Sequence, residues 1–209
     1  MEPLVLALPE TKKLKEISNL RTQITTPKGT AQYPKLRSPE FFEGAEVGYT
    51  IQMSFSKEDT EKLLAKLEEE LDAAKNASEF KGKKWTNARL GSREDKNGDT
   101  VFKFKTKTSY TTKTGEVKQR RIPIFDAHGN LIKGDIGHGS ICRVRFTVNP
   151  YHKSAVNCGL TLYLDAVQVI EYKEPGGASA EAYGFDKEDG YTVTENETVS
   201  DTSFDTEEF

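Results

Sequence analysis

The sequence has few of the residues from which disulfide frameworks and metal centres are built. Its 209 residues include two cysteines, three histidines and one tryptophan. Cys142 and Cys158 do not form a Cys-x-x-Cys motif, and two reduced thiols are the simpler interpretation, with a disulfide between them left open. The histidines have neither His-x-x-x-His nor Glu-x-x-His spacing. The sequence therefore lacks the motif of a zinc enzyme, and we expect no cofactor.

Long apolar runs are also missing. The longest candidate, residues 159–172, is too short to span a bilayer and contains Asp165 and Glu171. The N-terminal apolar stretch follows Glu2 and has no basic segment before it, so it does not match a secretory signal. We therefore expect a cytoplasmic protein that has no membrane partner.

Charge is distributed very unevenly along the chain. Residues 1–173 hold 29 Lys and Arg against 22 Asp and Glu, a net charge of +7, whereas residues 174–209 hold one against 11, a net charge of −10. A segment so acidic and so poor in apolar residues cannot bury enough surface to fold alone. A basic body joined to a disordered acidic tail indicates that the body binds a polyanion and that the tail competes with it.

The end of this tail has a chemistry of its own. Asp205, Glu207 and Glu208 precede a C-terminal Phe209. Acids, an aromatic ring and the terminal carboxylate together form an anchor for a basic, hydrophobic pocket, so we predict that these four residues bind a protein partner. A tail that only increases solubility is the alternative.

Hydrophobic periodicity predicts one β-rich domain. Five prolines within residues 1–45 predict an extended N-terminal arm. Alternation over residues 47–55 predicts the first strand, and leucines at helical spacing predict a helix over about 57–76, capped by Ser56 with Asp59 three residues later. Further strands are predicted at 101–108, 116–122, 141–149, 160–164 and 166–170.

This order predicts a mainly β fold. Short strands with glycine turns and one helix favour a small antiparallel barrel, although periodicity alone does not separate a barrel from a sandwich. We predict a five-stranded antiparallel OB-fold-like barrel over residues 46–173 with one long inserted helix, followed by a disordered, flexible acidic tail over 174–209. The OB barrel is a platform that binds nucleic acids in many proteins.

Several predicted strands carry cations on their outward faces, because side chains two residues apart on a strand point the same way. These cations are Lys103, Lys105, Lys107, Arg120, Arg121, Arg143 and Arg145. If the strands are neighbours, they form one positive surface that binds phosphates through counterion release. The alternative is a solubilising face, since lysine on strands also prevents edge pairing.

Aromatic residues near cations can stack on bases, each worth about 1–3 kcal/mol. The candidates are Trp85 beside Lys83 and Lys84, Tyr110, Tyr151 beside Lys153, and Tyr163. A core position is the alternative for Trp85, because a single tryptophan is more often a packing residue. We add all of these residues to the predicted nucleic-acid site.

Three segments carry a resemblance to a known family: Tyr33–Pro39, Gly159–Tyr172 and the acidic end Gly184–Phe209. With them the chain resembles the phage single-stranded-DNA-binding proteins that join one OB-fold to an acidic tail ending in Phe. The resemblance implies cooperative binding to single strands, with self-association on the DNA. It also implies tail contacts with replication proteins (polymerase, helicase or primase) in the host cytoplasm.

We therefore predict non-enzymatic binding and protection of single-stranded DNA during phage replication or recombination. Two other classes of function stay open. A metal-dependent nuclease would use Asp126, His128, Asp135 and His138 as ligands, although nothing in their spacing requires it. A structural or interaction protein whose tail only solubilises it would have no salt-dependent affinity for DNA.

Overall fold

The computed structural model describes residues 21–176, and the predicted tail residues Asp205, Glu207, Glu208 and Phe209 lie outside this range. The strands are β1 Gln23–Thr25, β2 Gly29–Phe42, β3 Ala45–Ser54, β4 Ser92–Glu94, β5 Thr100–Thr106, β6 Ser109–Thr111, β7 Val117–Gln119, β8 Ile124–Phe125, β9 Ile141–Ser154 and β10 Asn157–Glu171. Within the described range, helix α2 Lys57–Asn76 connects β3 to β4.

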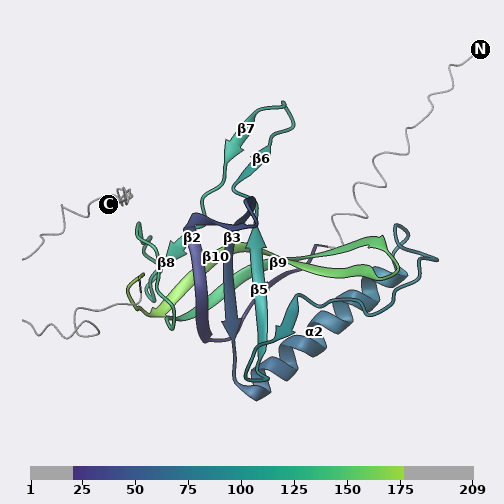
Figure 1. The fold of residues 1–209 in the computed structure, drawn as a ribbon, viewed down its shortest axis with the longest axis horizontal. Coiled ribbons are helices and arrows are strands. Elements are labelled where there is room, and N and C mark those ends of the chain that lie inside the picture. The colour runs from purple at the N-terminus through teal and green to yellow at the C-terminus, as the bar shows by residue number, and fades with distance from the viewer. Residues whose placement is uncertain (1–20, 177–209) are drawn as a thin grey trace, which may run out of the picture. The chain divides into compact units, whose positions relative to one another are not determined.

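Five of these strands close into a barrel (Figure 1). β2 pairs with β3, β3 with β5, β5 with β10, β10 with β9, and β9 with β2. This confirms the predicted mainly β, OB-like barrel with one long helix. Four contacts are antiparallel and the β5–β10 contact is parallel. A ring of five strands cannot alternate direction at every contact, so a purely antiparallel barrel of this size is impossible.

The N-terminal segment departs from the prediction. We expected residues 1–45 to be an extended arm, but Gly29–Phe42 is a barrel strand and β1 pairs with β9 at its side. The two prolines inside β2, Pro34 and Pro39, are accommodated because the pairing with β3 shifts register on both sides of Lys35. Proline lacks a donor for the ladder and is tolerated at such irregularities.

The barrel interior is filled by apolar residues that alternate along the strands. They include Ile51, Met53, Phe102, Phe104, Val144, Phe146, Leu162 and Leu164, all buried. The segments expected as two strands, 160–164 and 166–170, form the single strand β10, which changes register against β9 after Leu164. Cys142 and Cys158 are buried and free, so no disulfide joins them.

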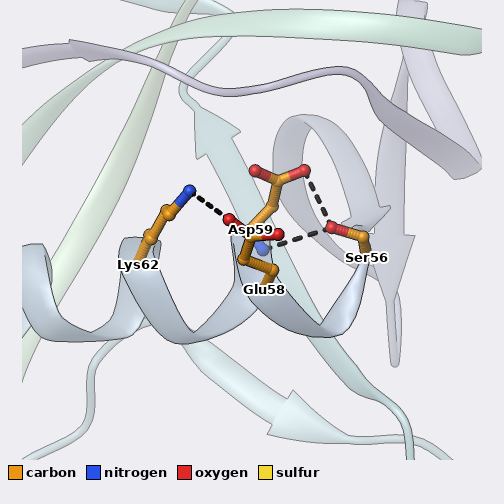
Figure 2. A network of polar contacts seen from close by, with 4 residues as sticks. All are labelled: Ser56, Glu58, Asp59 and Lys62. Carbon is orange, nitrogen blue, oxygen red and sulfur yellow. Dashed lines mark hydrogen bonds and ion pairs between the residues drawn. The ribbon is translucent and has the colours of Figure 1, made fainter.

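Helix α2 has the predicted bounds because its start is fixed locally (Figure 2). The Ser56 hydroxyl accepts a hydrogen bond from the Asp59 backbone N–H (3.2 Å) and donates one to the Asp59 carboxylate (2.8 Å). Lys62 pairs with Glu58 at 2.6 Å on the next turn. From this cap the leucine stripe, which includes Leu67, faces the barrel core. No helix in the described range is long and apolar enough to cross a membrane.

Residues 86–94, which follow α2, fill the gap where β5 and β10 diverge. The Arg89 N–H donates to Cys158 O (3.1 Å), and Arg89 O accepts from the Leu160 N–H (2.7 Å). This approach requires glycine at position 159, where φ is +145° and a Cβ atom would lie 2.1 Å from Arg89 O. Arg89 is therefore held by its backbone at the barrel surface.

Candidate nucleic-acid interface

A groove of about 610 Å³ lies over β5 and β10 on the outer face of the barrel. Five cations line it: Arg89, Lys103, Lys105, Lys107 and Lys153. Two tyrosines, Tyr151 and Tyr163, and uncharged polar residues such as Asn149, Asn157 and Thr161 complete the lining. No acidic residue of the described range lines this groove. We call it the basic groove.

Strand register explains why cations and rings meet there. Tyr163 of β10 lies opposite Lys105 of β5, and the neighbouring pair is Leu162 with Phe104. Phe104 and Leu162 are buried in the core, so the alternate residues Lys105 and Tyr163 point outward. Tyr163 remains 39% exposed, which leaves part of its ring free for a ligand. The predicted outward Lys face of this strand is therefore correct, and the phenylalanines between the lysines face the core.

The lysines of β5 are not equivalent. Lys103 Nζ lies 2.7 Å from a carboxylate oxygen of Glu40, and the two side chains are 33% and 30% exposed. Partial burial alone would raise the pKa of Glu40. Hydrogen bonds from Lys103 and Thr50 and the positive charges of Lys103 and Arg93 outweigh it and bring the pKa below its ordinary value. Lys105 and Lys107 make no ion pair within the described residues.

A basic hairpin follows β5 directly. β6 and β7 pair with each other in a separate two-stranded sheet, which projects beyond the end of β5 (Figure 1). The Arg120 guanidinium lies 5.3 Å from the centre of the Tyr110 ring, and Arg121 is exposed. Tyr110 and Arg120 therefore form one cation–aromatic unit beside the groove, outside its lining.

Arg143 and Arg145 lie elsewhere. Both are exposed on β9, and Arg145 donates hydrogen bonds to Gln23 (3.0 Å) and Thr25 (3.1 Å) of β1. We expected the cationic strands to form one surface if they were neighbours. They are not neighbours, because β10 lies between β5 and β9 and β7 pairs with β6. The predicted cations are consequently divided among three places.

Trp85 is packed between α2 and the β9–β10 hairpin. Its ring meets Phe80 and His152 edge-on, with centroids 5.6 and 5.0 Å away. It lines a separate cavity of about 380 Å³ with acidic Glu68 and Asp72. Lys83 Nζ lies 4.8 Å from the Phe80 ring centre, and Lys84 contributes its carbonyl to His152 at 2.9 Å. These three predicted residues lie outside the basic groove, and stacking of Trp85 on a base stays a prediction.

Sequence reasoning missed Arg89, the fifth cation of the groove. It stands in a loop without strand periodicity, and no residue pattern near it indicates that its backbone bridges to Gly159. Asn149, Asn157 and Thr161 were missed because polar residues of strands carry no signal that separates groove from solvent. Only the packed fold brings these side chains to the groove.

The alternative metal site is not assembled. Asp126 accepts hydrogen bonds from the backbone N–H groups of His128 and Asn130, both at 2.8 Å, and bonds to Asn130 lower its pKa. Asp135 accepts from the Arg37 N–H at 3.3 Å. The His138 ring packs on Tyr33 at 5.1 Å. Between residues 21 and 176, no group of three or more His, Cys, Asp or Glu is arranged to hold a metal ion.

Comparison with known proteins gives a family. A family model described as single-stranded DNA-binding protein, bacteriophage T7, matches residues 42–172, more than half of the chain. No curated protein matches the sequence. The matched range contains β3 to β10, and therefore most of the barrel and the whole basic groove.

Solved structures show the same fold. The crystal structure of gp2.5, a single-stranded DNA-binding protein encoded by bacteriophage T7, aligns with a TM-score of 0.60 and 24% identity, covering 83% of this chain and 100% of that one. The single-stranded DNA-binding protein of bacteriophage Enc34 in complex with ssDNA aligns with a TM-score of 0.56 and 15% identity, covering 74% and 89%. With the family match, this places the chain in the bacteriophage T7 single-stranded DNA-binding protein family.

Proposed function

We propose that the protein binds single-stranded DNA in the basic groove and protects it, without catalysis, during phage DNA replication and recombination. The observation that carries this proposal is a groove lined by five cations and two tyrosines and, among the described residues, by no acid. Lysine and arginine neutralise phosphates, and the exposed ring of Tyr163 can stack on a base. Bases must be unpaired to reach such a ring, which favours single strands over duplex DNA.

The groove residues divide into two roles. Lys105, Lys107, Lys153 and Arg89 bind the phosphate backbone, because they are the groove cations without an ion pair in the described part of the chain. Tyr151 and Tyr163 stack on bases. The Tyr110–Arg120 unit continues the positive surface beyond Lys107 along the β6–β7 hairpin.

A salt titration tests this function. Affinity for single-stranded DNA is expected to fall linearly with salt on logarithmic axes, with a slope of about −0.7 per neutralised phosphate. Replacing both Lys105 and Lys107 with Gln should make the slope shallower by about 1.4. The matched control replaces Arg143 and Arg145 with Gln, which removes two outward strand charges outside the groove. Equal effects of the two double variants would reject the groove as the site.

The same preparation separates binding from nuclease activity. We expect single-stranded DNA incubated with the protein and Mg²⁺ or Mn²⁺ to stay intact. Metal-dependent degradation that copurifies with the protein and is lost in an Asp126→Asn variant would support the nuclease instead.

For the tail, we propose two roles. Its net charge of −10 is tethered to a body of +7, so it competes with DNA for the cations, while Asp205, Glu207, Glu208 and Phe209 recruit replication proteins such as a polymerase, helicase or primase. Self-association on DNA and a location in the host cytoplasm complete the proposal.

Truncation separates these roles. Deleting residues 188–209 should tighten DNA binding at low salt, and the gain should shrink as salt screens the tail. Removing only Phe209 should leave DNA affinity unchanged and weaken binding of the partner protein. Equal DNA affinity of full-length and truncated protein at low salt would refute the competition.

A further inference from the structure

The tip of the β2–β3 hairpin exposes two large aromatic side chains at consecutive positions. Phe41 is 62% and Phe42 is 66% exposed, at the end of β2. The turn after them is tight, because Glu43 and Gly44 both have positive φ, +50° and +76°. Neither ring belongs to the core cluster, and exposed apolar side chains that gather at one place are a feature of binding sites.

The tip is held against the end of β5. The Thr108 hydroxyl, just after Lys107, donates a hydrogen bond to the Glu46 carboxylate. Gly48 packs so closely on this segment that a Cβ atom there would lie 2.2 Å from Thr106 O. The hairpin tip therefore has a fixed position relative to the basic groove.

Strand alternation shows which ring faces the groove. Glu40 of β2 points to the outer face of the barrel, because its carboxylate pairs with Lys103, an outward residue of β5. Glu40 pairs with Gly48, but the next residue, Phe41, pairs with Glu46. The unpaired extra residue, Val47, therefore belongs to β3, and β2 keeps its regular alternation from Glu40 to Phe42. Side chains two apart on a regular strand point the same way, so Phe42 shares the face of Glu40 and Phe41 points to the opposite face.

The groove reaches this tip. Val47, which lines the groove, is the neighbour of Glu46, the residue paired with Phe41. Lys105 and Lys107 line the same end and make no ion pair within the described residues. Of the three acids around the two phenylalanines, Glu40 bonds Lys103 and Glu46 bonds Thr108, whereas Glu43 on the turn makes no ion pair within the described residues. Phe42 is not part of the groove lining, but it stands on the strand that pairs with β3 at the Val47 end of the groove.

We propose that Phe42 is a stacking residue for one unpaired nucleobase at the Val47–Lys107 end of the groove, beyond the bases held by Tyr151 and Tyr163. The inference rests on the proposed function and extends its site by one nucleotide. Phe41, on the other face of the hairpin, takes no part.

Phe41 provides a matched control for a substitution of Phe42. Phe42→Ala should weaken binding to a short single-stranded oligonucleotide about 5- to 150-fold, the range of one lost base stack. Phe41→Ala removes an equal ring from the same tip and should change affinity less than about twofold. Phe42→Trp should restore binding. Because both rings are exposed, thermal unfolding should be the same in all variants.

Abasic oligonucleotides make the test specific. The wild-type protein should lose affinity when the base nearest one end of the bound segment is removed. In Phe42→Ala, removal of that base should have no effect on affinity, whereas removal of the other bound bases should lower affinity as it does in the wild type. Equal effects of Phe41→Ala and Phe42→Ala, or unchanged abasic penalties, would overturn the inference and leave the function standing. A change of DNA-free self-association in Phe42→Ala would assign the ring to a protein contact instead. No binding of single strands by the wild type would overturn the function itself.

Discussion

Replacing Glu40 with Gln should make the protein bind single-stranded DNA more tightly. In the free protein the Glu40 carboxylate forms an ion pair with Lys103 at 2.7 Å, and it therefore competes with a DNA phosphate for this lysine. The amide keeps the size of the side chain and a weak acceptor for Lys103, but removes the negative charge. Lys103 then joins Lys105 and Lys107 as a cation available to DNA.

The magnitude follows from the exposure of the pair. With side chains 33% and 30% exposed, the pair is intermediate between a surface ion pair, worth at most about 1 kcal/mol, and a buried one, so we take about 1 kcal/mol as its strength. Relief of this competition corresponds to about a fivefold gain in affinity. One more neutralised phosphate should also make the salt slope steeper by about 0.7.

A double-mutant cycle isolates the effect. Lys103→Gln should cost less than about twofold in the wild type, where Lys103 is already paired, and about fivefold in the Glu40→Gln background. Fluorescence anisotropy with a labelled oligonucleotide, at four or more salt concentrations, measures both affinity and slope. Glu43→Gln is the control, because Glu43 lies on the neighbouring turn and makes no ion pair among the described residues.

Two results would refute this reasoning. If Glu40→Gln and Glu43→Gln gain equally, the gain reflects net charge alone. If Lys103→Gln costs the same in both backgrounds, Glu40 does not withhold Lys103 from DNA.

Three further predictions concern the fold. Gly159→Ala should lower the free energy of unfolding by about 2 kcal/mol and weaken DNA binding, because the added Cβ would displace the Arg89 backbone. Gly98→Ala is the control, because Gly98 also has a positive φ but its added Cβ would meet no atom, and this variant should keep DNA binding. Arg37→Ala should cost about 3 kcal/mol in urea unfolding, because its guanidinium donates to four backbone carbonyls that would lose their partner. The pKa of Glu40 is lowered, so the stability from its charge is present above pH 4.5 and is lost as pH falls through the folded-state pKa. Wild type should therefore lose more stability than Glu40→Gln as the pH is lowered below 4.5.

Local patterns predicted the elements whose causes are local. Helix α2 has the expected bounds because its cap at Ser56 and its leucine stripe lie within its own sequence. The alternation of Phe102 and Phe104 with Lys103 and Lys105 similarly separated the core face of β5 from its outer face. Such signals need no knowledge of the neighbouring strand.

Pairing between distant segments was beyond these patterns. Pro34 and Pro39 argued against a strand, yet register shifts accommodate them in β2. The positions of Arg143 and Arg145 depended on which strands are neighbours, and alternation does not determine strand order. Arg89 entered the groove only through a backbone bridge to Gly159, which no local pattern encodes.

The parallel contact that closes the barrel has a consequence for how this protein can vary. β5 and β10 are paired at only two positions, Phe104 with Leu162 and Lys105 with Tyr163, and residues 86–94 fill the rest of the opening. Residues that close the barrel at this contact also line the basic groove. Substitutions that change DNA affinity at this contact therefore also change the stability of the barrel, whereas the β6–β7 hairpin forms its own two-stranded sheet and can change in length without opening the barrel.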